Sequence, residues 1–116
     1  MSTHYIDSNQ RMSQAVIHNN TVWLAGQVAA DASQGMRGQT EQILEQIDLL
    51  LQRAGTDKSH LLSATLWITA FDHFDEMNAA WDAWVVPGRP PARACVKADL
   101  ARPEWLVEIM VVAAVP

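Results

Sequence analysis

Apolar and polar residues alternate along parts of this chain and recur every three to four residues along others. Two β-rich runs, residues 15–18 and 21–28, flank Asn19-Asn20 and predict a hairpin. Strict alternation along the second run would place one set of residues on one face and the intervening set on the other. These sets are Val22, Leu24, Gly26 and Val28 against Thr21, Trp23, Ala25 and Gln27.

Residues 31–38 predict a loop, and the segment after it has the apolar periodicity of a helix. The apolar residues from Ile43 to Ala54 form one stripe with a 3.6-residue period, and Gly55 is a suitable stop after it. Residues 61–70 predict a strand with Thr65, Trp67 and Thr69 on one face. A second helix is predicted with Asp72 as its N-cap. Its apolar stripe comprises Phe74, Met77, Trp81, Trp84 and Val85, and the proline-rich segment 87–91 ends it.

The last third of the chain predicts two strands, residues 92–99 and 105–115, joined by a turn at 101–104 as a hairpin or close pair. The element order is then β-β-α-β-α-β-β. This order predicts an α+β fold, a mixed β-sheet with two helices packed on one face.

Two helices can cover only one face of such a sheet. Strand parity assigns a common set of residues to the other face: Trp23, Trp67, Arg93, Cys95 and either Glu108 or its neighbours. Exposed tryptophans on an open face are unfavourable in a monomer, so we expect a second copy of the chain to cover it.

Composition narrows the class of protein further. The 116 residues suit one domain spanning 1–116, and 49% hydrophobic against 18% charged residues excludes disorder. The net charge of −5 disfavours nucleic-acid binding. We find no export signal and no apolar run long enough for a bilayer, so we expect a cytoplasmic protein with no membrane association. One cysteine and four histidines without shared spacing predict no metal site.

Candidate chemistry is concentrated between Pro90 and Met110. Arg93 lies among small apolar residues, and Glu108 interrupts an apolar run. A hairpin would bring Arg93, Cys95 and Glu108 together on one sheet face. Two interpretations stay open: a small-anion site in which the guanidinium binds a carboxylate and Glu108 holds a water, or a cross-strand ion pair.

The remaining candidates give weaker signals. No histidine is linked in sequence to Cys95, which favours an inert thiol over a nucleophile. Asn78 lies one position off the apolar stripe of its helix, where it either caps a neighbouring loop or contacts a ligand. The Trp81/Trp84 pair is more typical of a core than of a ligand platform.

At Arg93 and Glu108 the sequence resembles the reactive intermediate deaminase family, RidA, also called YjgF. The resemblance covers nearly the whole chain. It is carried by Pro91-Ala92-Arg93-Ala94-Cys95-Val96, Val107-Glu108-Ile109, Ala25-Gly26-Gln27-Val28 and Phe74-Asp75-Glu76-Met77-Asn78. Segments 77–84 and 107–115 resemble the YoaB-type branch most.

The resemblance implies a chorismate-mutase-like fold and a homotrimer with ligand clefts between subunits. It also implies hydrolysis of enamines and imines, such as 2-aminoacrylate, to 2-oxo acids and ammonia without a metal or organic cofactor. In this family pattern Arg93 holds the substrate carboxylate, Glu108 positions the attacking water with help from the Cys95 backbone, and Asn78 lines the cleft.

Two ligand-contacting positions depart from the family pattern. Met12 stands where a tyrosine is expected, and Ala25 stands in place of a serine or threonine before Gly26. Both changes remove a hydroxyl and make the expected pocket more apolar. The leading hypothesis is therefore an imine deaminase acting on a small carboxylate-bearing metabolite. Its alternatives are a non-catalytic module that binds such a metabolite and a ribonuclease, which the net charge disfavours.

Overall fold

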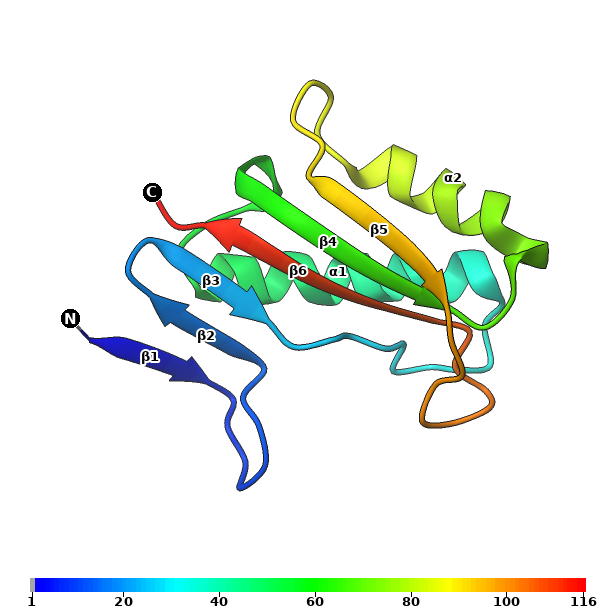
Figure 1. Ribbon diagram of the computed structural model, residues 1–116, viewed down its shortest axis with the longest axis horizontal. Helices are drawn as coiled ribbons and strands as arrows, with labels where there is room; N and C mark the ends of the chain where they lie inside the picture. Colours follow the sequence, from blue (N-terminus) through cyan, green and yellow to red (C-terminus); the bar gives the residue numbers. More distant parts are fainter. Residues whose placement is uncertain (1) are drawn as a thin grey trace.

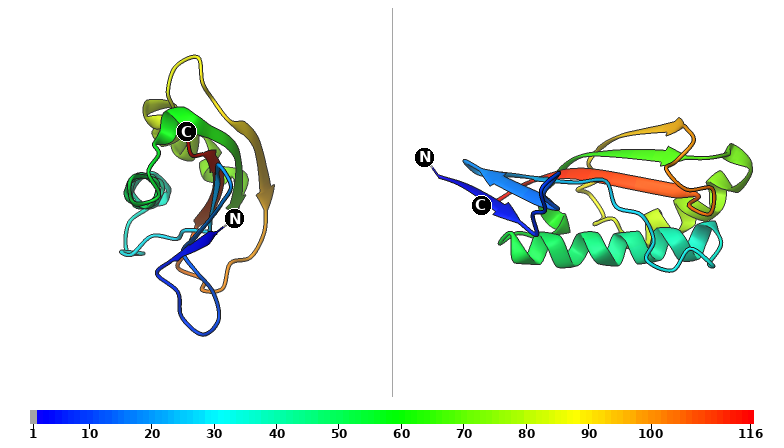
Figure 2. Two further views of the ribbon diagram at one scale, coloured as in Figure 1. Left: turned by 90° about the vertical axis from the view of Figure 1, so that its left-hand side faces the viewer. Right: turned by 90° about the horizontal axis from the view of Figure 1, so that it is seen from below.

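The computed structural model describes residues 2–116, in which a mixed sheet carries both helices on one side (Figures 1 and 2). The helices are α1 (Met36–Arg53) and α2 (Phe74–Trp84), with one-turn 3-10 helices η1 (Lys58–His60) and η2 (Phe71–His73). The strands are β1 (Thr3–Ile6), β2 (Ala15–His18), β3 (Thr21–Leu24), β4 (Leu61–Ile68), β5 (Ala92–Lys97) and β6 (Val107–Ala114). The predicted α+β architecture is confirmed.

The strand order is β1-β2-β3-β6-β4-β5, with β4 and β5 parallel and the other neighbours antiparallel. The prediction that the last two strands form a hairpin or close pair is therefore wrong, because β4 lies between them. The crossover through α2 lays β5 parallel to β4 at the edge of the sheet. The chain then returns along the other side of β4, where β6 also pairs with β3.

Element boundaries also differ from the prediction in places. The short edge strand β1 was not predicted, because its central residues His4 and Tyr5 are exposed and give no alternating apolar signal. Helix α1 begins seven residues before Ile43, at Met36, so that Gly38 lies inside it rather than in a loop. Asp72 is not an N-cap, because it lies in η2 and the residue that precedes α2 is His73.

The core lies between the sheet and the two helices. The predicted stripe of α1 is buried, with Ile43, Ile47 and Leu51 at 0% exposure, and Gly55 ends the helix with a φ of 87°. Each such side chain contributes roughly 1.5–3 kcal/mol when it is removed from water. The two tryptophans of α2 join this core with ring centroids 5.4 Å apart. Neither helix within residues 2–116 combines the length and apolar character that a membrane crossing requires.

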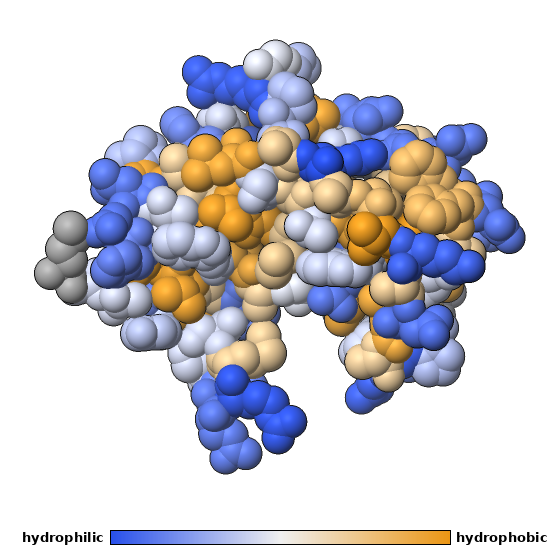
Figure 3. All heavy atoms as spheres, viewed as in Figure 1, coloured by the Kyte–Doolittle hydropathy of each residue, from blue (hydrophilic) through white to orange (hydrophobic). Residues whose placement is uncertain are grey.

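The second face of the sheet has no helix on it and faces the viewer in Figure 1. Trp23 and Trp67 lie there as predicted, since their neighbours along each strand are buried. Figure 3 shows hydrophobic residues spread over the middle of this face, and Trp23, Met110 and Val96 are exposed on it. The placement of Arg93 and Cys95 on this face is wrong. Both pair in register with core-facing residues of β4, Ala64 and Leu66.

Candidate functional site

Arg93 lies on the edge strand β5 and extends over helix α2. Its guanidinium carbon is 5.3 Å from the centroid of the Trp81 ring, and its side chain is exposed. No carboxylate within residues 2–116 forms an ion pair with it. A guanidinium that contacts an aromatic ring and has no ion-pair partner keeps N–H groups free for a carboxylate.

Two further predicted residues lie on the helix side of the sheet. Cys95 is half-buried against the core, and burial raises the pKa of its thiol while the positive charge of Arg93 opposes the shift. Asn78 lies one helical turn before Trp81 on α2. Its Oδ1 is buried and accepts no hydrogen bond from the part of the chain that the structure describes, which argues against a loop cap through this atom.

Glu108 lies on the opposite, open face of the sheet. Its two neighbours along β6, Val107 and Ile109, are fully buried. Glu108 pairs in register with Trp67 of β4. Burial raises the pKa of its carboxyl, and neither a cation nor a hydrogen-bond donor among residues 2–116 offsets that shift. A half-buried carboxylate without a partner is costly for a fold to keep.

Gly26 faces Glu108 from the end of β3. Trp23 pairs with Val112, and Gln27 pairs with Ile109. Three residues lie between Trp23 and Gln27, but only two lie between Ile109 and Val112 on β6, so the segment after β3 contains a β-bulge. The prediction of unbroken alternation to Val28 is therefore wrong: Gln27 is 7% exposed, and Gly26 faces the open-face residue Glu108.

Met12 lies in the loop between β1 and β2 and is 43% exposed. The Asn9 side chain accepts hydrogen bonds from the backbone N–H groups of Arg11 and Met12, at 2.7 and 2.9 Å. At the end of this loop the Gln14 carbonyl accepts a hydrogen bond from Ala25 N–H at 2.8 Å. The two positions that depart from the family pattern thus belong to adjoining segments.

The structure does not bring Arg93 and Glu108 together. Their strands are separated by β4, and Arg93 is three residues away from the position level with Glu108. Strand spacings of ~4.8 Å and rises of ~3.3 Å put their Cα atoms about 14 Å apart, with side chains on opposite faces. Both the predicted one-face constellation and the alternative of an Arg93–Glu108 ion pair are therefore wrong.

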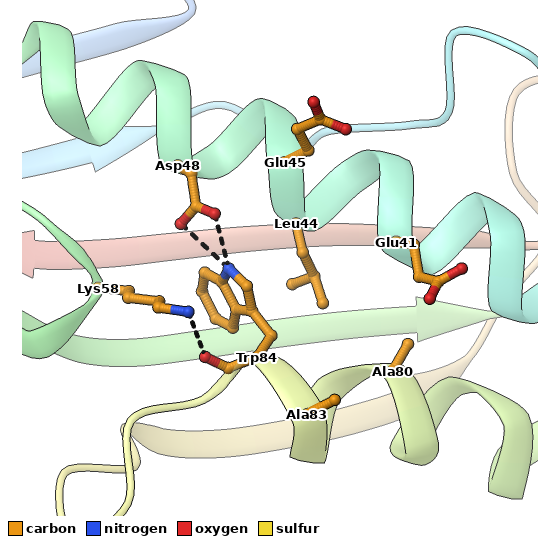
Figure 4. A pocket seen from close by; sticks show the side chains of 8 residues that line it. All are labelled: Glu41, Leu44, Glu45, Asp48, Lys58, Ala80, Ala83 and Trp84. Carbon is orange, nitrogen blue, oxygen red and sulfur yellow. Dashed lines mark hydrogen bonds between the residues drawn. The ribbon is translucent and has the colours of Figure 1, made fainter.

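A groove of about 240 Å³ lies between α1 and α2, away from all the predicted site residues. Figure 4 shows Asp48 accepting hydrogen bonds from the Trp84 indole N–H, and Lys58 donating to the Trp84 carbonyl. Asp48 and Lys58 thus already hold Trp84 of α2 in place.

Sequence reasoning missed two supporting residues. Trp81 was treated as core alone, although it is also the surface beneath Arg93. Gln27 donates to the Gln14 side chain at 2.9 Å, and Gln46 on α1 donates to Gln27 at 3.3 Å. Three glutamines distributed over the sequence gave no periodic signal.

The chain matches known proteins along almost its whole length. The family model described as Endoribonuclease L-PSP matches residues 2–115. A RutC family protein of Haemophilus ducreyi is 44% identical, covering 95% of this chain and 94% of its own. The RutC family protein YoaB of Escherichia coli is 45% identical, covering 95% and 96%. The crystal structure of NMB1025 from Neisseria meningitidis, a member of the YjgF protein family, superimposes with a TM-score of 0.97 at 43% identity, covering 100% and 97%.

Proposed function

Because this chain belongs to the YjgF/RidA family, in its YoaB-like branch, we propose that it hydrolyses small 2-imino acids to 2-oxo acids and ammonia. The observation that carries the proposal is Glu108, a half-buried carboxylate with a raised pKa and no partner in the described part of the chain. Carboxyl groups with such a raised pKa are typical of sites where a side chain accepts and donates a proton during catalysis.

The site is formed by two copies of the chain. Within one copy, Arg93 and Glu108 are too far apart for a substrate with a handful of heavy atoms to reach both. The open face exposes Trp23 and Met110, which favours its burial against another copy. Arg93, Asn78 and Cys95 of one copy then face Glu108, Gly26, Ala25 and Met12 of the next. The homotrimer of the family pattern supplies such an arrangement.

The reaction requires only water addition and loss of ammonia. Arg93 binds the substrate carboxylate through its two-pronged guanidinium, with Trp81 holding the guanidinium plane. Glu108 accepts a proton from water as the oxygen bonds to the imine carbon. That proton is returned to the imine nitrogen, which gives a carbinolamine. The remaining hydroxyl proton is then transferred to the nitrogen as the C–N bond breaks and the C=O bond forms, so the 2-oxo acid and ammonia leave. Because the imine carbon is already electrophilic, most of the rate acceleration comes from orienting the substrate and the attacking water.

Met12 and Ala25 bear on substrate choice. Neither side chain offers a hydroxyl, so this wall of the cleft is apolar. We expect imines with apolar side chains to be preferred over those with hydroxylated ones.

A coupled assay tests the proposal. An amino-acid oxidase generates 2-imino acids in solution, and semicarbazide traps those that are not hydrolysed. We expect the wild-type protein to lower semicarbazone formation. Glu108→Gln should abolish this effect, and Arg93→Ala should lose most of it at substrate concentrations well below KM. No acceleration by the wild type across aliphatic and aromatic imines would refute the enzyme.

Two other functions predict different results. A metabolite-binding module would bind 2-oxo acids through Arg93 without hydrolysing imines and would tolerate Glu108→Gln. A ribonuclease, the activity in the name of the matching family model, would cleave RNA with a steep salt dependence.

A further inference from the structure

Gly26 occupies a position where any side chain would collide with Glu108. A Cβ built on Gly26 would lie 2.1 Å from Glu108 Oε2, 2.9 Å from Cδ and 3.2 Å from Cγ. Optimal separations between non-bonded heavy atoms are about 3.5–4.0 Å. The carboxylate therefore occupies the volume that the methyl group of an alanine would need.

Backbone conformation does not require glycine here. The glycines with positive φ are Gly55 and Gly88, and Gly26 is not among them. Gly26 therefore lies outside the left-handed region, in which glycine is favoured over larger residues. The contact with Glu108 is thus the constraint that this structure places on the position.

Neither backbone is free to move away. Gln27, which follows Gly26, exchanges hydrogen bonds with Ile109, which follows Glu108, at 2.9 and 3.1 Å. On the other side of Gly26, Ala25 N–H donates to the Gln14 carbonyl at 2.8 Å. The Gln27 side chain is itself buried and donates to Gln14. A substitution at Gly26 must therefore displace the flexible end of the Glu108 side chain.

We propose that Gly26 is a positioning residue: by lacking a Cβ, it lets the Glu108 carboxylate lie back against the end of β3. In that position the carboxylate is half-buried and level with Trp67. The effect on turnover, which rests on the proposed function, is to keep this carboxylate where it accepts the proton of the attacking water. Substrate binding through Arg93 does not depend on Gly26.

Steady-state kinetics of three variants test this role. We expect Gly26→Ala to lower kcat by at least about tenfold, with KM and 2-oxo acid affinity changed by less than about threefold. Gly35→Ala is the matched control, because a Cβ there would meet no atom within 4 Å, and it keeps wild-type kcat. Glu108→Asp shortens the carboxylate side chain and makes room for the methyl group. The double variant Gly26→Ala/Glu108→Asp should therefore be no slower than Glu108→Asp alone. Additive losses in the double variant, or a parallel loss of affinity in Gly26→Ala, would overturn the proposal.

A titration that needs no turnover separates this role from the proposed function. The carboxyl carbon of Glu108, identified in 13C-labelled protein by its loss in Glu108→Gln, is followed against pH by NMR. We expect its midpoint to move down in Gly26→Ala and to stay in Gly35→Ala, because displacement relieves the burial that raises the pKa. A shifted midpoint in a protein that hydrolyses no imine would retain the positioning role and refute the deaminase. An unshifted midpoint would refute the positioning role.

Discussion

The two charged residues at the centre of the proposed site lie in opposite kinds of surroundings. Arg93 is exposed at the sheet edge, with its guanidinium 5.3 Å from the centroid of a buried tryptophan ring. Glu108 is half-buried on the open face, between fully buried neighbours, and no described residue pairs with its carboxylate. The arginine keeps its charge at little cost, whereas the carboxylate is retained against a desolvation penalty.

In the proposed reaction, this difference suits Arg93 to substrate binding and Glu108 to proton transfer. An exposed guanidinium keeps its hydration until a ligand arrives, which suits a reversible clamp for a carboxylate. A carboxylate with a raised pKa is a better proton acceptor and donor near neutral pH than an exposed one. Substitution of Glu108 should therefore lower kcat, whereas substitution of Arg93 should lower substrate affinity.

Glu108→Gln should give the largest effect. The amide cannot accept a proton from water, so we expect kcat to fall by about 10²–10⁴-fold, the usual contribution of general acid–base catalysis. The substitution also removes a buried charge, so the free energy of unfolding at pH 7 should rise. A coupled deaminase assay and urea denaturation measure the two quantities. Unchanged kcat, or lower stability, would contradict the functional assignment.

The pH dependence of stability sharpens the same point. Since the folded pKa of Glu108 is raised above its unfolded value, the folded state binds more protons between the two values. The contribution of Glu108 to stability therefore falls as pH rises through this interval and is constant below it. Urea midpoints of wild type and Glu108→Gln should converge at low pH and separate as pH rises from the ordinary carboxyl range. Parallel curves would show that the Glu108 carboxyl is not perturbed.

Arg93→Ala should give a smaller effect, and on binding. Charge-assisted hydrogen bonds contribute about 1.5–3 kcal/mol, so 2-oxo acid affinity should fall about 10- to 100-fold. The residue is exposed and unpaired, so stability should change by less than about 0.5 kcal/mol. Lys97→Ala is the matched control, because Lys97 is an exposed cation on the same strand and face. Calorimetric titration with a 2-oxo acid measures the affinity, and equal losses in both variants would indicate non-specific attraction.

Cys95→Ala should give the smallest effect. Burial raises the pKa of the thiol, so it is protonated near neutral pH and a poor nucleophile. We expect kcat to stay within about threefold of wild type, since any contribution of Cys95 comes from its backbone. Slow alkylation of the native protein by iodoacetamide should accompany this result. Loss of activity comparable with Glu108→Gln would instead assign the thiol a chemical role.

The sequence predicted the elements whose signals are local. The stripe of α1, the turn at Asn19-Asn20 and the faces of β4 follow from short-range periodicity. Strand adjacency is not local: β5 and β6 are consecutive, yet β4 separates them. The assumption that they pair led directly to the wrong common face for Arg93 and Glu108. The predicted faces of Gly26 and Gln27 were also wrong, because the bulge after Leu24 shifts the alternation by one residue. A bulge is defined by the pairing with another strand, so the local sequence does not show it.

The residue pattern itself pointed to Arg93, Cys95, Glu108 and Asn78 as candidates. The family resemblance added Met12 and Ala25 and supplied the roles, which remain proposals. The structure adds their separation into two groups, Arg93 with Trp81 and Asn78 on the helix side and Glu108 with Gly26 on the open face. No residue pattern could have shown this separation, because it depends on which strands are neighbours.

The most direct test is to mix, in one oligomer, two variants that are each nearly inactive at substrate concentrations well below KM. Arg93→Ala and Glu108→Gln are co-expressed with different tags, and the mixed oligomers are isolated through both tags and assayed for imine hydrolysis. In each mixed trimer, one of the three subunit contacts pairs an intact Arg93 with an intact Glu108, so about a third of wild-type activity should return. Mixed oligomers as inactive as the two parents would contradict a site shared between two copies of the chain.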